Sequence, residues 1–254
     1  MHIVAVHNLP QNKESLAAVL AAALGATVYE ALSRLRSPGK GPFVVGVFAA
    51  IGPAEELVKK LRLGGFEAAL LKEDETETEA VGFVVRKFRF SGDALIVESR
   101  KKESLSIDYS SIDLIIRGTS IAQSTVTETV KEKKFDAGMA LLTSGLKMTK
   151  TIEKTLESTV QTREGFFYLY AGDQQTLIFR EGGLAYDSLG TALQPTKQAN
   201  FTYLLEELRR RSPEAIYDDR LLNRAGQVQL LGPSLSPEKH TNIATSLLAK
   251  VLRL

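Results

Sequence analysis

The spacing of the apolar residues changes once along this chain, at the acidic stretch KEDETETEA, residues 72–80. Before this stretch, apolar residues recur at helical spacing between short runs rich in valine and alanine. After it, apolar and polar residues alternate, which is typical of half-buried β-strands. The stretch itself combines several carboxylates with no large apolar side chain, which favours a solvated linker. We therefore predict an α+β protein of two domains, residues 1–72 and 81–254, joined by a linker at 73–80.

The first predicted domain has the element order βααβαβ. Gly25 is a helix stop between the two helices that follow the first strand, and Pro38-Gly39 ends the second of them. The third helix has Pro53 near its first turn, where proline is well tolerated. The predicted strands are HIVAVH, PFVVGVFA and EAALLK, at residues 2–7, 42–49 and 67–72, and the predicted helices lie within residues 8–26, 27–37 and 52–66.

The glycine-rich stretch SPGKGPFVVGVFA, residues 37–49, raises the question of a phosphate-binding loop around Lys40. Such a loop joins a strand to the helix after it, so that backbone N–H groups and the helix N-terminus face the phosphates. Here the glycines follow a helix and lead into a strand. Arg34 stands where the first glycine of GxxxxGK would be, and Gly41-Pro42 follow in place of serine or threonine. We interpret the stretch as a helix stop and turn rather than a nucleotide site.

Three features of residues 1–75 resemble two related small domains, the ClpS protease adaptor and the C-terminal domain of the bacterial ribosomal stalk protein. These features are the strand IVAVHN, the GKG turn before a valine-rich strand, and the helix AEELVKKLRLGGF leading to a last apolar strand. The resemblance implies a compact α/β domain and, for ClpS, the order βααβαβ. ClpS adaptors hold a peptide N-terminus with acidic and histidine side chains; here Asn8 matches, but Leu9-Pro10 and Ser37 replace those groups. The peptide α-amine would have no carboxylate partner, so we expect the fold without that activity.

The second predicted domain, residues 81–254, is rich in β-strands and ends in helices. The predicted strands are FVVRKFRF, ALIVESR, SLSIDY, SIDLIIRGTSI, GFFYLYAG, TLIFREG and LAYDSLG. An amphipathic helix follows in NFTYLLEELRRRSP, and a second one has Ser236 as its N-cap and Pro237 at its first position. Residues 81–212 loosely resemble a pleckstrin-homology-type module, a class that binds proteins, peptides or lipid head groups. The insertion at 119–163 departs from that pattern.

The insertion is the strongest candidate for an interaction site. Its two stretches rich in threonine and charge, STVTETVKEKK and KMTKTIEKTLESTVQT, could pair as a long two-stranded ribbon. The patch between them either folds down as core or forms an exposed apolar tip ringed by lysines, which would mark a partner or membrane surface. The candidate binding residues are Phe135, Met139, Leu141, Leu142, Leu146, Lys147 and Lys150.

Candidate catalytic groups are sparse. The three histidines, His2, His7 and His240, include no pair at helical spacing, so we expect solvated or hydrogen-bonded imidazoles rather than a metal site. Asp218 and Asp219 could serve a cation, but a turn between helices, with Asp219 paired to Arg220 or capping a helix, explains them equally well. The cluster Arg209–Arg211 at a helix C-terminus is accounted for by the helix dipole there. We predict no catalytic, metal or cofactor-binding residues.

Composition narrows the function mainly by exclusion. The chain has no cysteine, which excludes disulfides, thiolate catalysis and cysteine-ligated metals. Its net charge is +2 with both signs interspersed, so we expect no nucleic-acid partner. The start MHIVAVHNLP lacks the pattern of a signal peptide, and no window approaches the roughly 18 apolar residues that span a bilayer. We therefore expect a cytoplasmic location and no cofactor.

Three functional hypotheses remain open at this point. The first is a non-catalytic cytoplasmic binding or scaffold protein with an unidentified protein partner. The second is an oligomerising or peripheral membrane-associated protein that acts through residues 133–150. The third, placed last, is an enzyme whose catalytic residues are dispersed along the sequence.

The patch at 135–146 gives a first test. If it is an exposed tip, Leu141→Asp combined with Leu142→Asp should leave the fold intact and abolish self-association or binding to anionic liposomes. If it is core, two buried carboxylates without partners would cost several kcal/mol, about enough to unfold a typical domain. Circular dichroism with sedimentation separates the two cases. A native spectrum with unchanged mass and unchanged liposome binding would leave the patch without a role.

Overall fold

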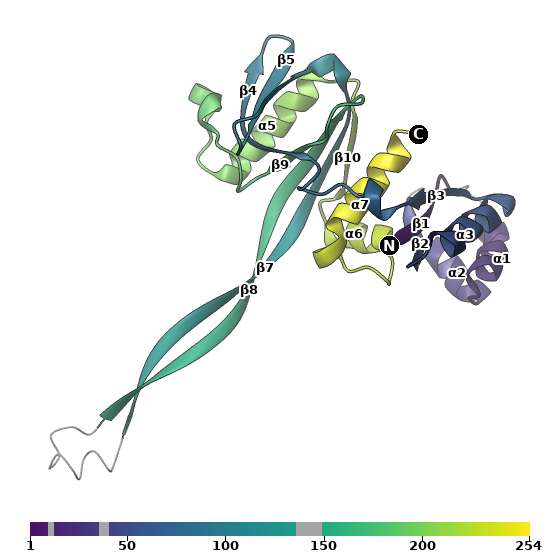
Figure 1. The fold of residues 1–254 in the computed structure, drawn as a ribbon, viewed down its shortest axis with the longest axis horizontal. Coiled ribbons are helices and arrows are strands. Elements are labelled where there is room, and N and C mark those ends of the chain that lie inside the picture. Colours follow the sequence, from purple (N-terminus) through teal and green to yellow (C-terminus); the bar gives the residue numbers. More distant parts are fainter. Residues whose placement is uncertain (10–12, 36–40, 136–148) are drawn as a thin grey trace. The chain divides into compact units, whose positions relative to one another are not determined.

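The computed structural model describes residues 1–9, 13–35, 41–135 and 149–254, and of residues 13–15, 121–135 and 149–162 it describes the backbone alone. Contacts between residues group the chain into two units (Figure 1). The main unit comprises Met1–Ser120 with Glu164–Leu254, and the second unit comprises Ile121–Arg163. The structure mixes helices and sheets, which confirms the predicted α+β class.

The first part of the main unit confirms the predicted order βααβαβ. Its elements are β1 (His2–His7), α1 (Lys13–Leu24), α2 (Val28–Leu35), β2 (Phe43–Phe48), α3 (Ile51–Leu63) and β3 (Glu67–Leu71). The strands form an antiparallel sheet of order β2-β1-β3. Because side chains alternate along a strand, Val4 and Val6 pack against α1, α2 and α3, whereas Ile3 and Ala5 join a second cluster on the opposite face. The central strand is therefore buried on both faces.

A second, larger sheet and the helices that pack on it follow β3 along the chain. These elements are β4 (Phe83–Ser91), β5 (Ala94–Ser99), β6 (Ser104–Asp108), β7 (Ile112–Phe135), β8 (Thr149–Ala171), β9 (Leu177–Arg180), α5 (Lys197–Arg211), β10 (Ile216–Leu221), α6 (Arg224–Leu231) and α7 (Pro237–Leu252). The seven strands have the order β10-β7-β8-β9-β4-β5-β6. Parallel pairs join β10 to β7 and β4 to β9, and the pairs of β4 with β5, β5 with β6 and β8 with β9 are antiparallel.

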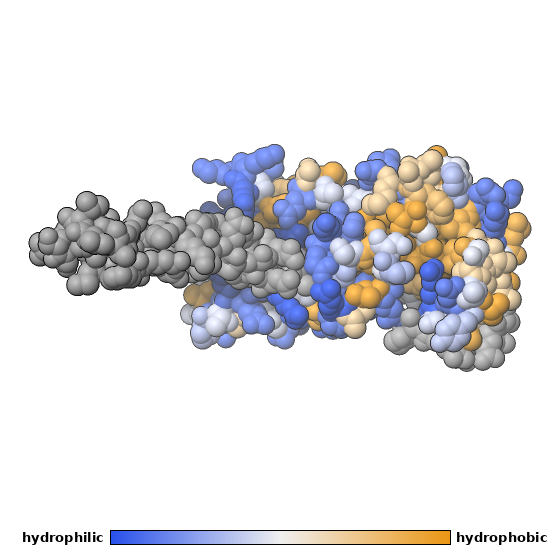
Figure 2. Space-filling model, turned by 90° about the horizontal axis from the view of Figure 1, so that it is seen from below, coloured by the Kyte–Doolittle hydropathy of each residue, from blue (hydrophilic) through white to orange (hydrophobic). Residues whose placement is uncertain are grey.

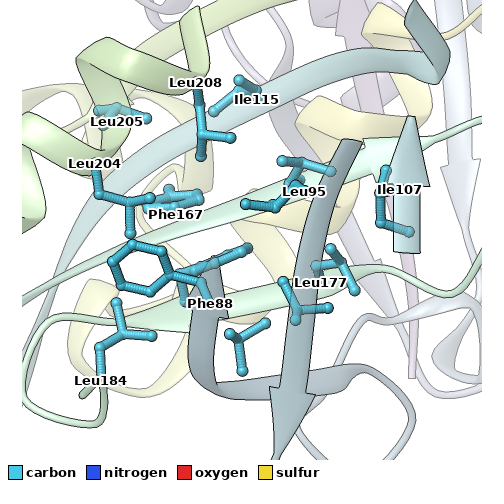
Figure 3. Close-up of a cluster of buried hydrophobic side chains, with 14 of the residues drawn as sticks. Phe88, Leu95, Ile107, Ile115, Phe167, Leu177, Leu184, Leu204, Leu205 and Leu208 are labelled. Atoms are coloured by element: carbon cyan, nitrogen blue, oxygen red, sulfur yellow. The ribbon is translucent and has the colours of Figure 1, made fainter. Parts of the chain in front are cut away.

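Helix α5 covers one face of the seven-stranded sheet. Figure 3 shows its leucines Leu204 and Leu208 lying over Phe167 of β8. The Phe167 ring stacks on Phe179 with a centroid distance of 4.2 Å and contacts Phe201 of α5 at 5.2 Å. Each of these large aromatic side chains buries a large apolar area in this core.

Helices α6 and α7 cover the opposite face of the same sheet. Leu247 of α7 is fully buried in a cluster that includes Phe166 and Tyr168 of β8, and the same cluster includes Ile3 and Ala5 of β1. Helix α7 therefore packs against both sheets of the main unit. The predicted start of α7 is also found, with Ser236 at the N-cap position and proline next to it.

The acidic stretch 73–80 begins with a 3₁₀ turn and is bonded to α7. Lys250 of α7 pairs with Glu75 at 2.6 Å, and the backbone N–H of Glu77 donates to Ser246 at 2.7 Å. Most of the stretch is exposed, yet these bonds tie it to the body of the main unit. The contact grouping accordingly keeps the residues on both sides of the stretch in one unit and separates Ile121–Arg163 instead.

Two local predictions differ from the structure. The segment LAYDSLG, predicted as a strand, forms a single bridge between Ala185 and Lys87 and then a 3₁₀ helix at Asp187–Ala192. Gly190 there has a φ of +53°, which interrupts any extended run. The turn predicted at Asp218 and Asp219 is also wrong, because both residues belong to β10. That strand pairs in parallel with Leu114, Ile115 and Ile116 of β7, a distant partner that no local pattern reveals.

The position of α7 between the two sheets gives a second test. Leu247→Ala should lower the free energy of unfolding by about 2–5 kcal/mol, because it leaves a cavity in the shared cluster. Amide hydrogen exchange should speed up in β1 as well as in the buried part of β8. Lys239→Ala, on the exposed side of α7, is the matched control. Unchanged protection in β1 would contradict the shared core.

Candidate functional site

Most of the binding residues predicted from the sequence lie outside the described part of the chain. These are Met139, Leu141, Leu142, Leu146 and Lys147. Phe135 ends β7 and Lys150 lies in β8, and the structure describes the backbone at both positions. The two strands are neighbours in the sheet, so the predicted pairing of the ribbon is confirmed. The role of the patch stays a prediction.

The GKG turn is described from Gly41 onward, and Ser37 and Lys40 lie outside the described residues. Gly41 has a φ of +86°, and a Cβ there would lie 2.8 Å from the carbonyl oxygen of Val6. Glycine is therefore required for the close approach of the turn to β1. Arg220 of β10 donates a hydrogen bond to the Gly41 carbonyl oxygen.

The acidic pair of β10 is engaged differently from the prediction. Asp218, rather than Asp219, pairs with Arg220, with Oδ2 lying 2.6 Å from Nη2. The reason is the strand itself, because residues two apart in a strand share a face. Among the described residues, no group of three or more histidine and acidic side chains is placed to hold a metal ion.

His7, at the end of β1, is buried beside the start of β3. Its Nδ1 lies 3.3 Å from Oε2 of Glu67, which also accepts a hydrogen bond from Asn8 at 2.7 Å. Burial lowers the pKa of His7, while the Glu67 carboxylate opposes that effect. The Asn8 hydrogen bond thus ties the first residue of β3 to the end of β1, while His7 Nδ1 has no hydrogen-bond partner among the described residues.

The arginine cluster at the end of α5 is held by more than the helix dipole. Arg210 and Arg211 both contact Glu207, each at 2.7 Å, and the Arg209 guanidinium lies 3.9 Å from the centre of the Tyr217 ring. Hydrogen bonds from Arg210 and then Arg211 lower the pKa of Glu207 to about 2. The contacts of Glu207 lie within α5, and the contact of Arg209 with Tyr217 joins the end of α5 to β10.

A cleft of about 870 Å³ opens where β4 and β9 meet the turn between β5 and β6. Three of its charged side chains have partners within the cleft. Arg180 pairs with Glu79 at 2.9 Å, and Glu164 accepts a hydrogen bond from the Gly182 backbone at 3.0 Å. Arg100 lies exposed among its lining residues. Arg180 and Glu79 therefore compensate each other's charge without a ligand.

The two sheets end in four edges, and one of them is unlike the rest. Helix α6 packs on β2, and a Cβ at Gly232 would lie 3.1 Å from the Val44 carbonyl oxygen, so that edge is closely covered. The sequences of β6 and β10 are SLSID and IYDDRL, and their polar and charged residues discourage pairing with another chain. Strand β3 is EAALL, an apolar edge strand. Within the described strands, no partner pairs with its outer side.

The outer side of β3 presents backbone groups to solvent. Along this edge, backbone groups point alternately toward β1 and away from it. Arg62 of α3 donates to the carbonyl oxygen of Ala68 from Nη2 at 2.8 Å and from Nε at 3.2 Å, so Ala68 points outward. Leu70, two residues further on, therefore also points its N–H and carbonyl outward. Outside the sheet, no backbone hydrogen-bond partner of these Leu70 groups occurs in the described part of the chain.

A groove of about 530 Å³ runs beside this edge. It is lined by Glu55, Val58, Lys59, Arg62 and Leu63 of α3, together with Leu70 of β3. The α3 residues have the spacing i, i+3, i+4, i+7 and i+8, which forms one stripe on the helix surface. Leu63, at the end of the stripe, is 81% exposed. Figure 2 shows apolar surface gathered at the end of the main unit that carries the N-terminal elements.

Comparison of the chain with protein-family models, with curated proteins and with solved structures finds no match. The resemblances to ClpS, the stalk protein and pleckstrin-homology modules therefore stay predictions. In the described residues, no single helix is long and apolar enough to cross a bilayer, although α1 and α2 together, bent by 116°, reach that length and composition. The β3 groove could not be predicted from the sequence, because the segment EAALLK does not show whether it forms an edge strand or a central strand.

The contacts of Glu207 give a third test. Its pKa is lower in the folded chain than the usual 4.5, so its contribution to stability is present above pH 4.5 and is lost as pH falls toward 2. Glu207→Gln should therefore lower the melting temperature at pH 7, by an amount equivalent to about 0.5–1 kcal/mol for screened pairs. The difference from the native chain should vanish near pH 2. Glu206→Gln, which removes an exposed neighbouring carboxylate, should show no such pH dependence.

Proposed function

We propose that this chain is a non-catalytic binding protein that holds an extended segment of a partner protein against the outer edge of β3. The observation that supports this proposal is the combination of an apolar edge strand, outward backbone groups at Leu70 and an adjoining groove. An extended peptide that adds a strand to a sheet gains affinity from main-chain hydrogen bonds and specificity from pockets for alternate side chains. The β3 edge offers both.

Exposure of the groove is unfavourable for a protein without a partner. Apolar edge strands promote uncontrolled pairing, and soluble proteins usually protect them with charges, bulges or coverage. The other three edges of this chain carry such protection, whereas β3 has the guanidinium of Arg62 on one carbonyl oxygen. Covering Leu63 with a partner would contribute about 1.5–3 kcal/mol, the usual gain for a leucine side chain. A binding role explains why the edge remains uncovered.

The test of this proposal uses a short peptide of strand-forming residues. We would titrate the nitrogen-labelled chain with the capped hexapeptide Thr-Gln-Thr-Val-Thr-Gln and follow the backbone amides by NMR. The Leu70 amide should shift and become protected from hydrogen exchange, because it gains a main-chain partner. Weak binding, in the range of about 0.1–1 mM, is expected for so short a segment.

Leu70→Pro is the decisive variant. It removes the outward N–H but no bond to β1, so the sheet should persist while peptide binding disappears. Leu70→Val keeps the amide and serves as the matched control. Leu63→Asp, at the exposed rim of the groove, should also weaken binding without affecting the fold. Equal binding to the proline and valine variants would contradict strand addition, as would the absence of any shift at β3.

A second candidate function is self-association or attachment to a membrane surface through residues 133–150. The observation that favours it is the pairing of β7 with β8, which are 24 and 23 residues long. Residues 136–148 connect the ends of this pair, where the sequence predicts an apolar patch among lysines. The aspartate substitutions at Leu141 and Leu142 test this candidate separately from the β3 groove.

A further inference from the structure

The charges around the β3 groove specify what kind of segment fits there. Lys59 and Arg62 line the groove, and neither forms an ion pair with a carboxylate in the described part of the chain. Their neighbour Lys60, which does not line the groove, pairs with Glu56 at 2.8 Å. Glu55 is the one acidic residue among the lining residues. The groove thus carries two cations against one carboxylate.

Arg62 is the more informative of the two cations. Its guanidinium donates two N–H groups to the Ala68 carbonyl oxygen, at 2.8 and 3.2 Å, and this neutral partner leaves its charge uncompensated. A guanidinium has five donors in a planar fork that matches a carboxylate with two parallel hydrogen bonds. A carboxylate is therefore a stronger partner for Arg62 than the carbonyl oxygen that it now contacts.

From these observations, and resting on the proposed function, we infer that the segment bound at β3 is acidic. It carries a carboxylate and an apolar side chain two residues apart on the side that faces α3. This spacing follows from strand geometry, because residues i and i+2 lie on the same side of an extended chain. The carboxylate pairs with Arg62 and Lys59, and the apolar side chain packs against Val58, Leu63 and Leu70.

In this arrangement Arg62 has two positions. In the free chain its guanidinium is hydrogen-bonded to the Ala68 carbonyl oxygen. It thereby blocks one of the acceptors that a strand of the partner protein would use. An acidic segment draws the guanidinium to its carboxylate and frees that oxygen for a main-chain hydrogen bond. A neutral or basic segment offers no such exchange, so it must compete with Arg62 for the edge. Arg62 thereby disfavours the binding of neutral or basic segments at β3 and favours the binding of acidic ones.

The charges also argue against a second copy of this chain as the occupant. Pairing of β3 with the same strand of a second copy would bring the two α3 helices to the same junction. Lys59 and Arg62 of each copy would then remain without a carboxylate partner. Strand β3 supplies one acidic residue, Glu67, and that carboxylate is already engaged by Asn8 and His7. Two like-charged edges repel each other, whereas an acidic segment is attracted.

The test compares three capped hexapeptides that differ only at the second and sixth positions: Thr-Glu-Thr-Val-Thr-Glu, its near-isosteric glutamine version and its lysine version. The glutamate peptide should bind about fivefold or more tightly than the glutamine peptide in about 50 mM salt, and this preference should shrink in about 500 mM salt, where charges are screened. The lysine peptide should bind most weakly. Isothermal titration and the shift of the Leu70 amide report on the same event.

Charge variants locate the effect. Arg62→Gln and Lys59→Gln should each reduce the preference for the glutamate peptide, and Arg62→Glu should transfer it to the lysine peptide. Lys60→Gln, which removes a cation outside the groove, is the matched control and should leave the preference unchanged. Melting curves of each variant establish that the fold is kept. Because Lys59 is exposed, its variant remains informative even if Arg62 variants are less stable.

The outcomes separate the two proposals. Equal binding of the glutamate and glutamine peptides at β3 would overturn the acidic specificity and leave the proposed function standing. No binding of any of the three peptides would overturn both. A dimer of the native chain that is abolished by Leu70→Pro would make a second copy the occupant and would likewise overturn the inference. Retention of the full preference in both Arg62→Gln and Lys59→Gln would also contradict it.

Discussion

The packing of α7 against both sheets determines much of the architecture of the main unit. Its side chains Ala244, Leu247 and Leu248 are fully buried, in one cluster with residues of β1 and β8. Without this helix, the three-stranded sheet would expose an apolar face and the larger sheet would lose its cover beside β7 and β8. The acidic stretch after β3 is bonded to the same helix. The two sheets therefore share one core, although the sequence between them looks like a boundary between domains.

A helix that covers the faces of a sheet leaves its edges to be protected in other ways. The chain uses a different device at each edge: α6 lies against β2, polar residues occupy β6, and charged residues occupy β10. Strand β3 is short and apolar, and among the described residues Arg62 is the side chain that hydrogen-bonds to its outer side. This contrast, rather than any single contact, identifies the β3 edge as the place where the chain can accept another strand.

Local sequence patterns predicted the elements that are marked by the spacing of their own residues and by the residues at their ends. The helices α1, α2, α3, α5 and α7 and the strands of the N-terminal sheet follow from apolar spacing, helix stops and caps. Strand β10 was missed because its charged residues Asp218 and Asp219 resemble a turn, and its pairing with β7 joins segments about a hundred residues apart in sequence. The β3 groove was missed for a related reason. Whether EAALL is a central or an edge strand depends on sheet order, which local periodicity does not contain.

One feature of the α3 sequence indicates the groove once the order of strands in the sheet is known. Helix α3 buries Leu57, Val58 and Leu61 in the core, and yet it places the exposed Leu63 on the groove-lining stripe with Lys59 and Arg62. A helix with a single buried face would keep that stripe polar. The mixture of apolar and basic residues there is what a groove for an acidic, partly apolar strand requires. Arg62 serves both ends, because one side chain can protect the edge against a second copy of the chain and still favour a carboxylate when a partner segment arrives.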